Sequence, residues 1–201
     1  MRAVAVREDI RDLILDAAER LLGRYGFKKM TMDDLAQEVG VAKGTIYLHF
    51  SSKEEVALAR VDRVITRLAE ELRKISRSKK SPASCLQKML MLRVLFRFDS
   101  ARDYAESIDE QLTAIRPMLQ ARRQKHFQEE AQIFVSVLEE GKRTKELFFK
   151  DANYTAHNLL IATNALLPSG LNAREFNDRQ EIEERIFQIS RILVNGLSVK
   201  N

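Results

Sequence analysis

Residues 31–53 of this chain have the pattern of two short helices joined by a tight turn. The first helix starts after Thr31, whose hydroxyl can cap the free amides of the next turn. It stops at Gly40, where a left-handed backbone costs little, and a second helix of about residues 43–50 follows. Two helices joined by a turn of three to four residues form the motif that places the second helix in the major groove of DNA.

The second helix buries Ile46 and Phe50, which are four residues apart and share one face. Its other side chains stay accessible and offer a hydroxyl with a methyl group, a phenol, an imidazole and one cation. Such groups suit base edges, thymine methyls and phosphates. The alternative is a helical hairpin with no role in DNA binding, because many hairpins share this spacing. The predicted DNA contacts in this helix are Lys43, Gly44, Thr45, Tyr47 and His49.

The next helix begins with the capping box Ser52-Lys53-Glu54-Glu55. This box places Lys53 at the amino end of the helix, where a cation opposes the helix dipole. A lysine at that position is better placed beside a phosphate, so we add Lys53 to the predicted DNA contacts.

Several motifs in register extend this pattern over residues 14–59, where the sequence resembles the amino-terminal domain of the TetR family of bacterial transcription regulators. The motifs that carry the resemblance are Gly26-Phe27, Thr31, Leu35-Ala36, Gly40-Val41, Gly44-Thr45-Ile46-Tyr47, Phe50 and Ser52-Lys53-Glu54-Glu55.

The resemblance implies roles for individual residues. The residue matching Thr31 binds phosphate while it caps its helix, and the residue matching Lys53 commonly binds a phosphate. One position departs from the family pattern, because Ala42 stands where a serine is frequent, so a contact from this position is in doubt. The resemblance places Lys43, Thr45, Tyr47 and His49 in or beside the major groove.

Net charge does not by itself predict DNA binding. The chain has 201 residues, a net charge of +5 and a pI near 9.4. Residues 1–60 nevertheless hold equal numbers of basic and acidic side chains, ten of each. The DNA-binding prediction therefore rests on where individual residues lie.

The sequence indicates a soluble, cytoplasmic protein. Cys85 is the single cysteine, so an intrachain disulfide is excluded. The amino terminus has no apolar run typical of a signal peptide. Residues 152–173 carry no charged side chain, but four asparagines, a histidine, a proline and a glycine interrupt them, and a membrane span is not expected.

Apolar periodicity is helical almost everywhere, and the predicted fold is all-α with about nine helices. We expect a helix-turn-helix DNA-binding domain over residues 1–52 and a larger ligand-binding and dimerisation domain over residues 53–201. A connecting helix of about residues 53–77 joins them. The other helices are expected at about Asp9–Arg24, from Ser81-Pro82 through Leu86–Phe98, at Tyr104–Leu112, Pro117–Gly141, Ala152–Leu167 and Asp178–Leu197.

The second domain is expected to hold a small, largely apolar effector, as the family resemblance implies. Arg93 and Arg97 share a face of an otherwise apolar helix and require an anion or solvent. In one interpretation they bind an acidic head group in a pocket. In the other, the apolar residues are ordinary core and the arginines pair with Asp103 or Glu106. The predicted pocket residues are Met89, Leu92, Arg93, Phe96, Tyr104, Phe127 and Phe134.

The last two helices carry more apolar positions than one neighbouring helix needs. In the resembled family such helices pair with their copies in a second chain, and a two-fold dimer implies a palindromic operator. The alternative is a monomer in which these residues pack internally. The predicted dimer contacts are Leu159, Ala162, Leu166, Ile186, Ile189 and Leu193.

No residue pattern argues for an enzyme, a metal site or a cofactor. The three histidines are far apart in the sequence, and Cys85 is expected to be a small buried hydrophobe. Paired acids such as Glu129-Glu130 are expected on solvated helix faces. The sequence therefore predicts a dimeric, ligand-responsive repressor. The alternatives are an all-α sensor or carrier that no longer reads DNA, and an activator or corepressor-dependent regulator of the same fold.

Overall fold

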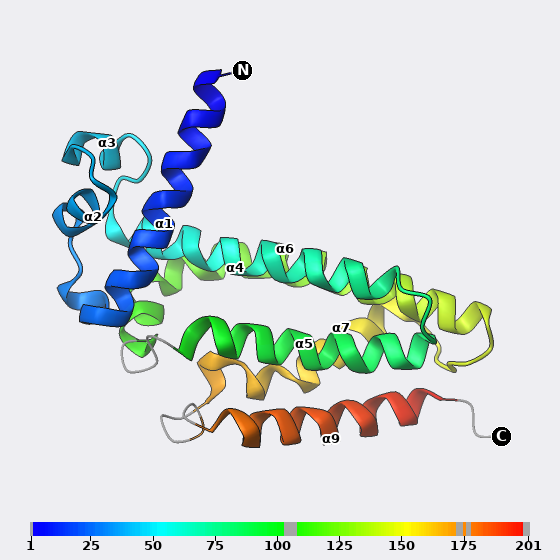
Figure 1. Cartoon of the computed structure of the whole chain (residues 1–201). Helices are drawn as coiled ribbons and strands as arrows, with labels where there is room; N and C mark the ends of the chain where they lie inside the picture. The colour runs from blue at the N-terminus through cyan, green and yellow to red at the C-terminus, as the bar shows by residue number, and fades with distance from the viewer. Residues whose placement is uncertain (1, 103–107, 172–174, 176–177, 199–201) are drawn as a thin grey trace. The chain divides into compact units, whose positions relative to one another are not determined.

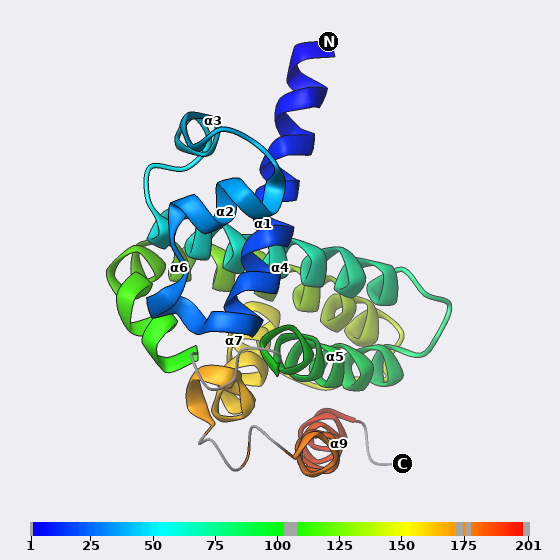
Figure 2. The same ribbon diagram turned by 60° about the vertical axis from the view of Figure 1, so that its left-hand side comes forward.

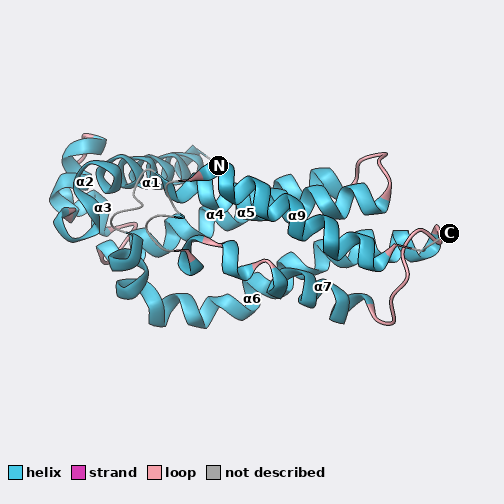
Figure 3. Ribbon diagram, turned by 90° about the horizontal axis from the view of Figure 1, so that it is seen from below, coloured by secondary structure: helices cyan, strands magenta, loops and turns pink. Residues whose placement is uncertain are grey.

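The computed structural model describes residues 2–102, 108–171, 175 and 178–198. This part of the chain contains eight α-helices and no β-strand (Figure 3), and one isolated bridge pairs Leu147 with Ser198. The all-α fold is confirmed, and the number of helices is close to the expected nine.

The α-helices follow the chain in the order labelled in Figure 1. Two short 3₁₀ helices, Asn164–Leu166 and Pro168–Gly170, lie between the last two. The α-helices are α1 (Arg2–Lys29), α2 (Met32–Val39), α3 (Lys43–Tyr47), α4 (Lys53–Ser76), α5 (Pro82–Arg102), α6 (Ile108–Arg143), α7 (Ala152–Ala162) and α9 (Arg179–Leu197).

The chain forms two compact units, which we describe separately. The first comprises residues 1–64 and 103–121, and the second comprises residues 65–102 and 122–201. The division falls inside α4 and α6, because each of these helices contributes residues to both units. The expected domains, 1–52 and 53–201, remain a prediction about function.

The core of the first unit lies where α1, α2 and α3 meet the start of α4. Helix α1 is broken at Gly26, whose φ of 73° is in the left-handed region, and this break lies near the predicted end of the first helix. The largest fully buried side chains of this unit include Ile14, Leu22, Met30, Leu35, Ile46, Phe50 and Leu58.

Helix α5, the otherwise apolar helix of the sequence analysis, contributes to the core of the second unit. Helix α9 lies beside it (Figure 1), and Arg179 of α9 forms an ion pair with Asp99 of α5 at 2.8 Å. Cys85 is buried and free, as expected. The core residues contributed by α5 are Cys85, Leu86, Met89 and Leu90, with Val94 and Phe98 also fully buried.

Helix α6 differs from the sequence prediction. A helix was expected to start at Pro117, because proline lacks the amide hydrogen that a helix interior uses. The structure instead places Pro117 inside α6, which runs without interruption from residue 108 to residue 143. Pro117 and Thr113, whose carbonyl loses its helical donor, are both exposed, so water can supply the missing hydrogen bond. The first part of the shorter helix expected over residues 104–112 lies outside the described residues.

The carboxyl-terminal helices begin as predicted, but α7 ends early. Asp151 caps α7 and Asp178 caps α9, each through its carboxylate and the amide three residues on. Helix α7 ends at Ala162 rather than Leu167, and the residues that follow adopt 3₁₀ geometry up to Gly170.

Candidate nucleic-acid interface and ligand cavity

The first short helix, α2, starts with a reciprocal cap. The hydroxyl of Thr31 accepts a hydrogen bond from the Asp34 amide at 3.1 Å, and the Asp34 carboxylate accepts the Thr31 amide at 2.9 Å. The same carboxylate accepts the Thr31 hydroxyl at 2.7 Å. Thr31 is exposed, so the residue that caps α2 is also accessible for the predicted phosphate contact.

The turn between α2 and α3 depends on Gly40. Its φ of 78° and ψ of 33° are left-handed, and its amide donates to the carbonyls of Ala36 and Gln37. The Val41 amide then donates to the carbonyl of Ala36 at 3.0 Å, which closes the end of α2. The two helices lie side by side in this unit (Figure 2), which gives the predicted helix-turn-helix geometry.

Helix α3 is anchored by one face and displays the other. Ile46 is fully buried and Phe50 is 1% exposed, while Tyr47 is 47% exposed. Helix α3 ends at Tyr47, three residues earlier than expected, and its amino end has no side-chain cap because Ala42 has no hydroxyl. Of the predicted contacts in this segment, Lys43, Gly44 and Tyr47 are exposed, and Thr45 and His49 are half-buried.

One outward residue was left out of the predicted contacts. Leu48 follows α3 directly and is 80% exposed. The signal in the sequence was its position between Tyr47 and His49, on the side away from Ile46. An exposed leucine here can contact a sugar or a thymine methyl.

Lys43 is held by an acid of α2. Its ammonium lies 2.9 Å from the carboxylate of Asp33, and this hydrogen bond raises the pKa of Lys43. Both side chains are more than half exposed, so the pair is weak and open to exchange with a phosphate.

Lys53 binds main-chain carbonyls in this structure. Its ammonium donates to the carbonyls of Phe27 and Lys28 at 3.1 Å each and of Met30 at 3.4 Å, and it lies 4.8 Å from the centre of the Phe27 ring. An ammonium has three donors, and all three are used here. Lys53 therefore binds the carbonyls at the end of α1 and is not available to a phosphate in this conformation.

The capping box before α4 is also arranged differently. The Ser52 hydroxyl accepts the Glu55 amide at 3.2 Å, as predicted. The Glu55 carboxylate accepts the amide of Ser51 at 2.7 Å and its hydroxyl at 2.8 Å.

The second unit contains a buried ion cluster. One carboxylate oxygen of Glu130 accepts a hydrogen bond from Arg93 at 3.1 Å. Arg97 donates to both carboxylate oxygens, at 3.0 Å each. Arg93 also donates to the side chains of Thr163 and Asn164. The sequence anticipated that the two arginines need an anion, but it placed Glu130 on a solvated face, and that was wrong because Glu130 is 5% exposed.

Burial and charge oppose each other in this cluster. Burial would raise the pKa of Glu130, but Arg97 and Arg93 outweigh this effect and hold it below the usual value. Burial lowers the pKa of Arg93 to about 10, although Glu130 opposes the shift. Two guanidinium groups share one carboxylate, so the cluster carries an excess positive charge.

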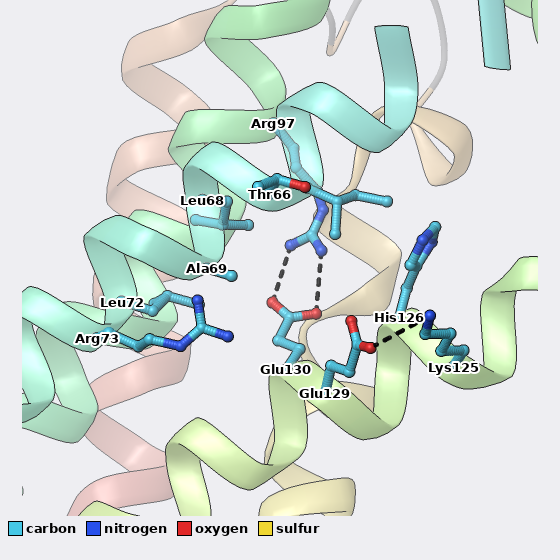
Figure 4. Close-up of a pocket in the computed structure, with 11 residues that line it drawn as sticks. Thr66, Leu68, Ala69, Leu72, Arg73, Arg97, Lys125, His126, Glu129 and Glu130 are labelled. Atoms are coloured by element: carbon cyan, nitrogen blue, oxygen red, sulfur yellow. Dashed lines mark hydrogen bonds and ion pairs between the residues drawn. The ribbon is translucent and has the colours of Figure 1, made fainter. Parts of the chain in front are cut away.

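A cavity of about 250 Å³ opens beside this cluster (Figure 4), and all of its walls belong to the second unit. Helix α4 supplies an apolar wall together with Thr66 and Arg73, and α5 supplies Arg97. Helix α6 supplies the other charged side chains and His126. The cavity is lined by Ile65, Thr66, Leu68, Ala69, Leu72, Arg73, Arg97, Lys125, His126, Glu129 and Glu130.

The pocket residues named from the sequence lie elsewhere. Met89 and Phe134 are fully buried in the core, and Leu92, Phe96 and Phe127 pack against it. Arg93 lies behind Glu130 and does not line the cavity. Tyr104 lies outside the described residues, as do Asp103 and Glu106. The predicted residues that the structure describes lie on α5 and α6, which also line part of the cavity, but none of them is among its lining residues.

The predicted dimer contacts fall on mixed faces of α7 and α9. Leu159, Leu166 and Ile186 are buried within their own chain, so they do not offer a contact surface in this structure. Ala162 is exposed, and Ile189 and Leu193 are half-buried. The exposed large apolar residues of the two helices are Tyr154, Ile161, Phe187 and Ile192.

Among the described residues, neither a candidate metal site nor a membrane-spanning helix is found. No group of three or more His, Cys, Asp or Glu side chains among them is placed to hold a metal ion. None of the described helices is long and apolar enough to cross a membrane.

This fold and this interface define a class of protein: all-helical proteins with an exposed helix-turn-helix. Residues 14–59 match the family model described as bacterial regulatory proteins, tetR family. The HTH-type transcriptional regulator TtgR of Pseudomonas putida is 33% identical over 86 residues, which cover 42% of this chain and 40% of TtgR. The uncharacterized HTH-type transcriptional regulator YerO of Bacillus subtilis is 28% identical over 94% of this chain and 65% of YerO.

A solved structure extends the similarity to the whole fold. The TetR/AcrR family transcriptional regulator from Thermobifida fusca has 25% sequence identity and a TM-score of 0.71, and the match covers 94% of this chain and 98% of that one. Residues 14–59 therefore form a TetR-family amino-terminal domain, and the fold over 94% of the chain is similar to that of a TetR/AcrR family regulator. The matches to TtgR and YerO cover less than two thirds of those curated relatives.

Replacing Lys53 with Met should destabilise the first unit in the absence of DNA. Three charge-assisted hydrogen bonds to main-chain carbonyls are lost, and we expect a decrease of roughly 1–2 kcal/mol in the free energy of unfolding. Urea unfolding followed by circular dichroism measures it. Lys43→Met is the matched control and should leave stability nearly unchanged, because its ion pair with Asp33 is exposed. If Lys53→Met and the wild type have the same stability, Lys53 does not stabilise the first unit.

Replacing Glu130 with Gln should destabilise the second unit by about 3–5 kcal/mol at neutral pH, because the change leaves buried guanidinium groups without a counter-ion. The folded-state pKa of Glu130 is depressed, so its contribution is complete above the ordinary value of about 4.5 and is lost as the pH falls through the folded value. The difference between wild type and variant should therefore shrink below about pH 4.5.

Glu129→Gln is the control for this measurement. Glu129 is adjacent, mostly exposed and 3.8 Å from Lys125, so its removal should change the urea midpoint little at any pH. If the two glutamine variants have the same stability at neutral pH, the buried cluster does not stabilise the unit.

Proposed function

We propose that the protein is a ligand-responsive transcriptional repressor that binds a palindromic DNA operator as a homodimer in the cytoplasm. The observation that carries the proposal is the outward face of α3. Lys43, Gly44 and Tyr47 are exposed on a helix that is anchored by Ile46, within a segment that matches the TetR family model. The relatives TtgR and YerO are both described as HTH-type transcriptional regulators.

Readout of DNA divides between side chains of different chemistry. Thr45 can contact a base edge or a thymine methyl, whereas Lys43 and the phenol of Tyr47 suit phosphates. Thr31 stands at the amino end of α2, where free amides and the helix dipole favour an anion. Lys53 contributes by holding the end of α1 in place.

The protein has two arrangements, one that fits the operator and one that does not. Ligand control follows if the effector binds the second arrangement more tightly than the first. The coupling is reciprocal, so operator DNA must weaken effector binding by the same factor. The cavity beside Arg97 is the candidate effector site, and α4 connects its apolar wall to the segment that follows the helix-turn-helix.

The DNA-binding proposal predicts retardation of the DNA upstream of the protein's own gene, with a steep dependence on salt. Lys43→Gln should reduce the slope of log K against log salt by about one per protomer, because one phosphate contact is lost. Thr45→Ala should change which base pair is preferred, and a systematic set of operator variants measures this by gel retardation. Binding to this DNA that is no tighter than to random duplex would reject the proposal.

The homodimer proposal predicts that Ile192→Glu yields a monomer. Ile192 is 68% exposed on α9, and Ile161 on α7 is 57% exposed, so both offer apolar surface to a second copy. A buried unpaired carboxylate at their contact would be costly. Analytical ultracentrifugation measures the mass, with Gln188→Glu, an exposed position on the same helix, as the control. A dimer that survives Ile192→Glu places the interface elsewhere.

A further inference from the structure

The cavity of the second unit has one apolar wall and one polar end. Ile65, Leu68, Ala69 and Leu72 of α4 form the apolar wall, and they recur at helical spacing along one face. Arg97 lies at the polar end, with its guanidinium directed at Glu130 (Figure 4). A ligand that fits both parts must be amphiphilic.

The charge of the polar end is positive. Arg73, Arg97 and Lys125 line the cavity together with Glu129 and Glu130, and Arg93 adds a further cation directly behind Glu130. Both oxygens of Glu130 already accept hydrogen bonds from the two arginines, and Glu129 lies near Lys125. The carboxylates are therefore compensated, and the remaining positive charge favours the binding of an anion.

Arg97 retains donors for such an anion. A guanidinium has five N–H groups. Arg97 uses one on Nη1 for Glu130, one on Nη1 for the carbonyl of Arg93, and one on Nη2 for Glu130. Its Nε–H and one Nη2–H have no partner among the described residues. Because 16% of the Arg97 side chain is exposed, against 2% for Arg93, Arg97 is the arginine that a ligand can reach.

We propose that the cavity binds a small carboxylate with a hydrocarbon chain, whose carboxylate binds Arg97 beside Glu130 and whose chain lies on the α4 wall. The volume of about 250 Å³ is slightly below the range of drug-sized sites, which indicates a short chain. Arg73, from the last turn of α4, lines the same cavity and adds a second cation to the site. This inference names the effector class and rests on the proposed effector site.

Calorimetric titration of the full chain without DNA tests the proposal. Octanoate, octanamide and octylamine share one hydrocarbon chain and differ in charge. We expect octanoate to bind at least about tenfold more tightly than the amide, because a hydrogen bond to a charged group is worth more than one to a neutral group. The amine should bind most weakly. Equal binding of the amide, stronger binding of the amine, or no binding of octanoate at millimolar concentration would overturn the proposal.

Two variants locate the site. Arg97→Gln should weaken octanoate by about tenfold or more and leave octanamide unchanged, while Glu130 keeps its bond to Arg93. Ala69→Leu fills the apolar part, keeps every charge and should weaken both ligands. Arg143→Gln is the control, because this arginine also pairs with a glutamate but does not line the cavity. Unchanged octanoate affinity in both Arg97→Gln and Ala69→Leu would place binding elsewhere.

Gel retardation in the presence of octanoate separates this inference from the proposed function. If octanoate binds through Arg97 without weakening operator binding, the ligand class stands and the proposed coupling fails. If the operator is bound but octanoate is not, the ligand class fails and the DNA-binding function stands.

Discussion

The anchoring of α3 through Ile46 and Phe50 is the constraint on which the DNA-binding surface depends. A five-residue helix is far below the length at which an isolated helix is stable in water. Burial of each of these side chains contributes roughly 1.5–3 kcal/mol, and this tertiary contact holds the segment helical. Because all of the anchoring is on one side, the other side of α3 takes no part in packing. Its residues are displayed by the fold but do not maintain it.

The parts of the structure that local signals control could be predicted from the sequence. Thr31, Gly40 and the apolar pair Ile46 and Phe50 act within a few residues of their own position, and each was found where expected. The start of α9 at Asp178 is of the same kind. The helical content followed from periodicity, which needs no knowledge of tertiary neighbours.

The errors concern partners that are distant in the sequence. Glu130 lies 37 residues from Arg93 and 33 from Arg97, and nothing near it distinguishes it from the exposed Glu129. Lys53 finds its carbonyls 23 to 26 residues away, where α1 breaks at Gly26. The side of α5 and α6 that lines the cavity also depends on packing between helices. In each case helical periodicity gives the face, but it does not give the partner of that face.

The contact between Lys53 and the end of α1 has a mechanical consequence. The chain leaves α1 at residues 27–30, forms α2 and α3, and returns to Lys53, whose ammonium binds the carbonyls at the point of departure. Helices α2 and α3 thus form a loop that is closed at its base by a cation. Because the hydrogen bonds of Lys53 hold the two ends of this loop together, we expect a small movement of the first turn of α4 to carry the end of α1 with it. Helix α3 lies between these two ends in the chain, so we expect it to move with them.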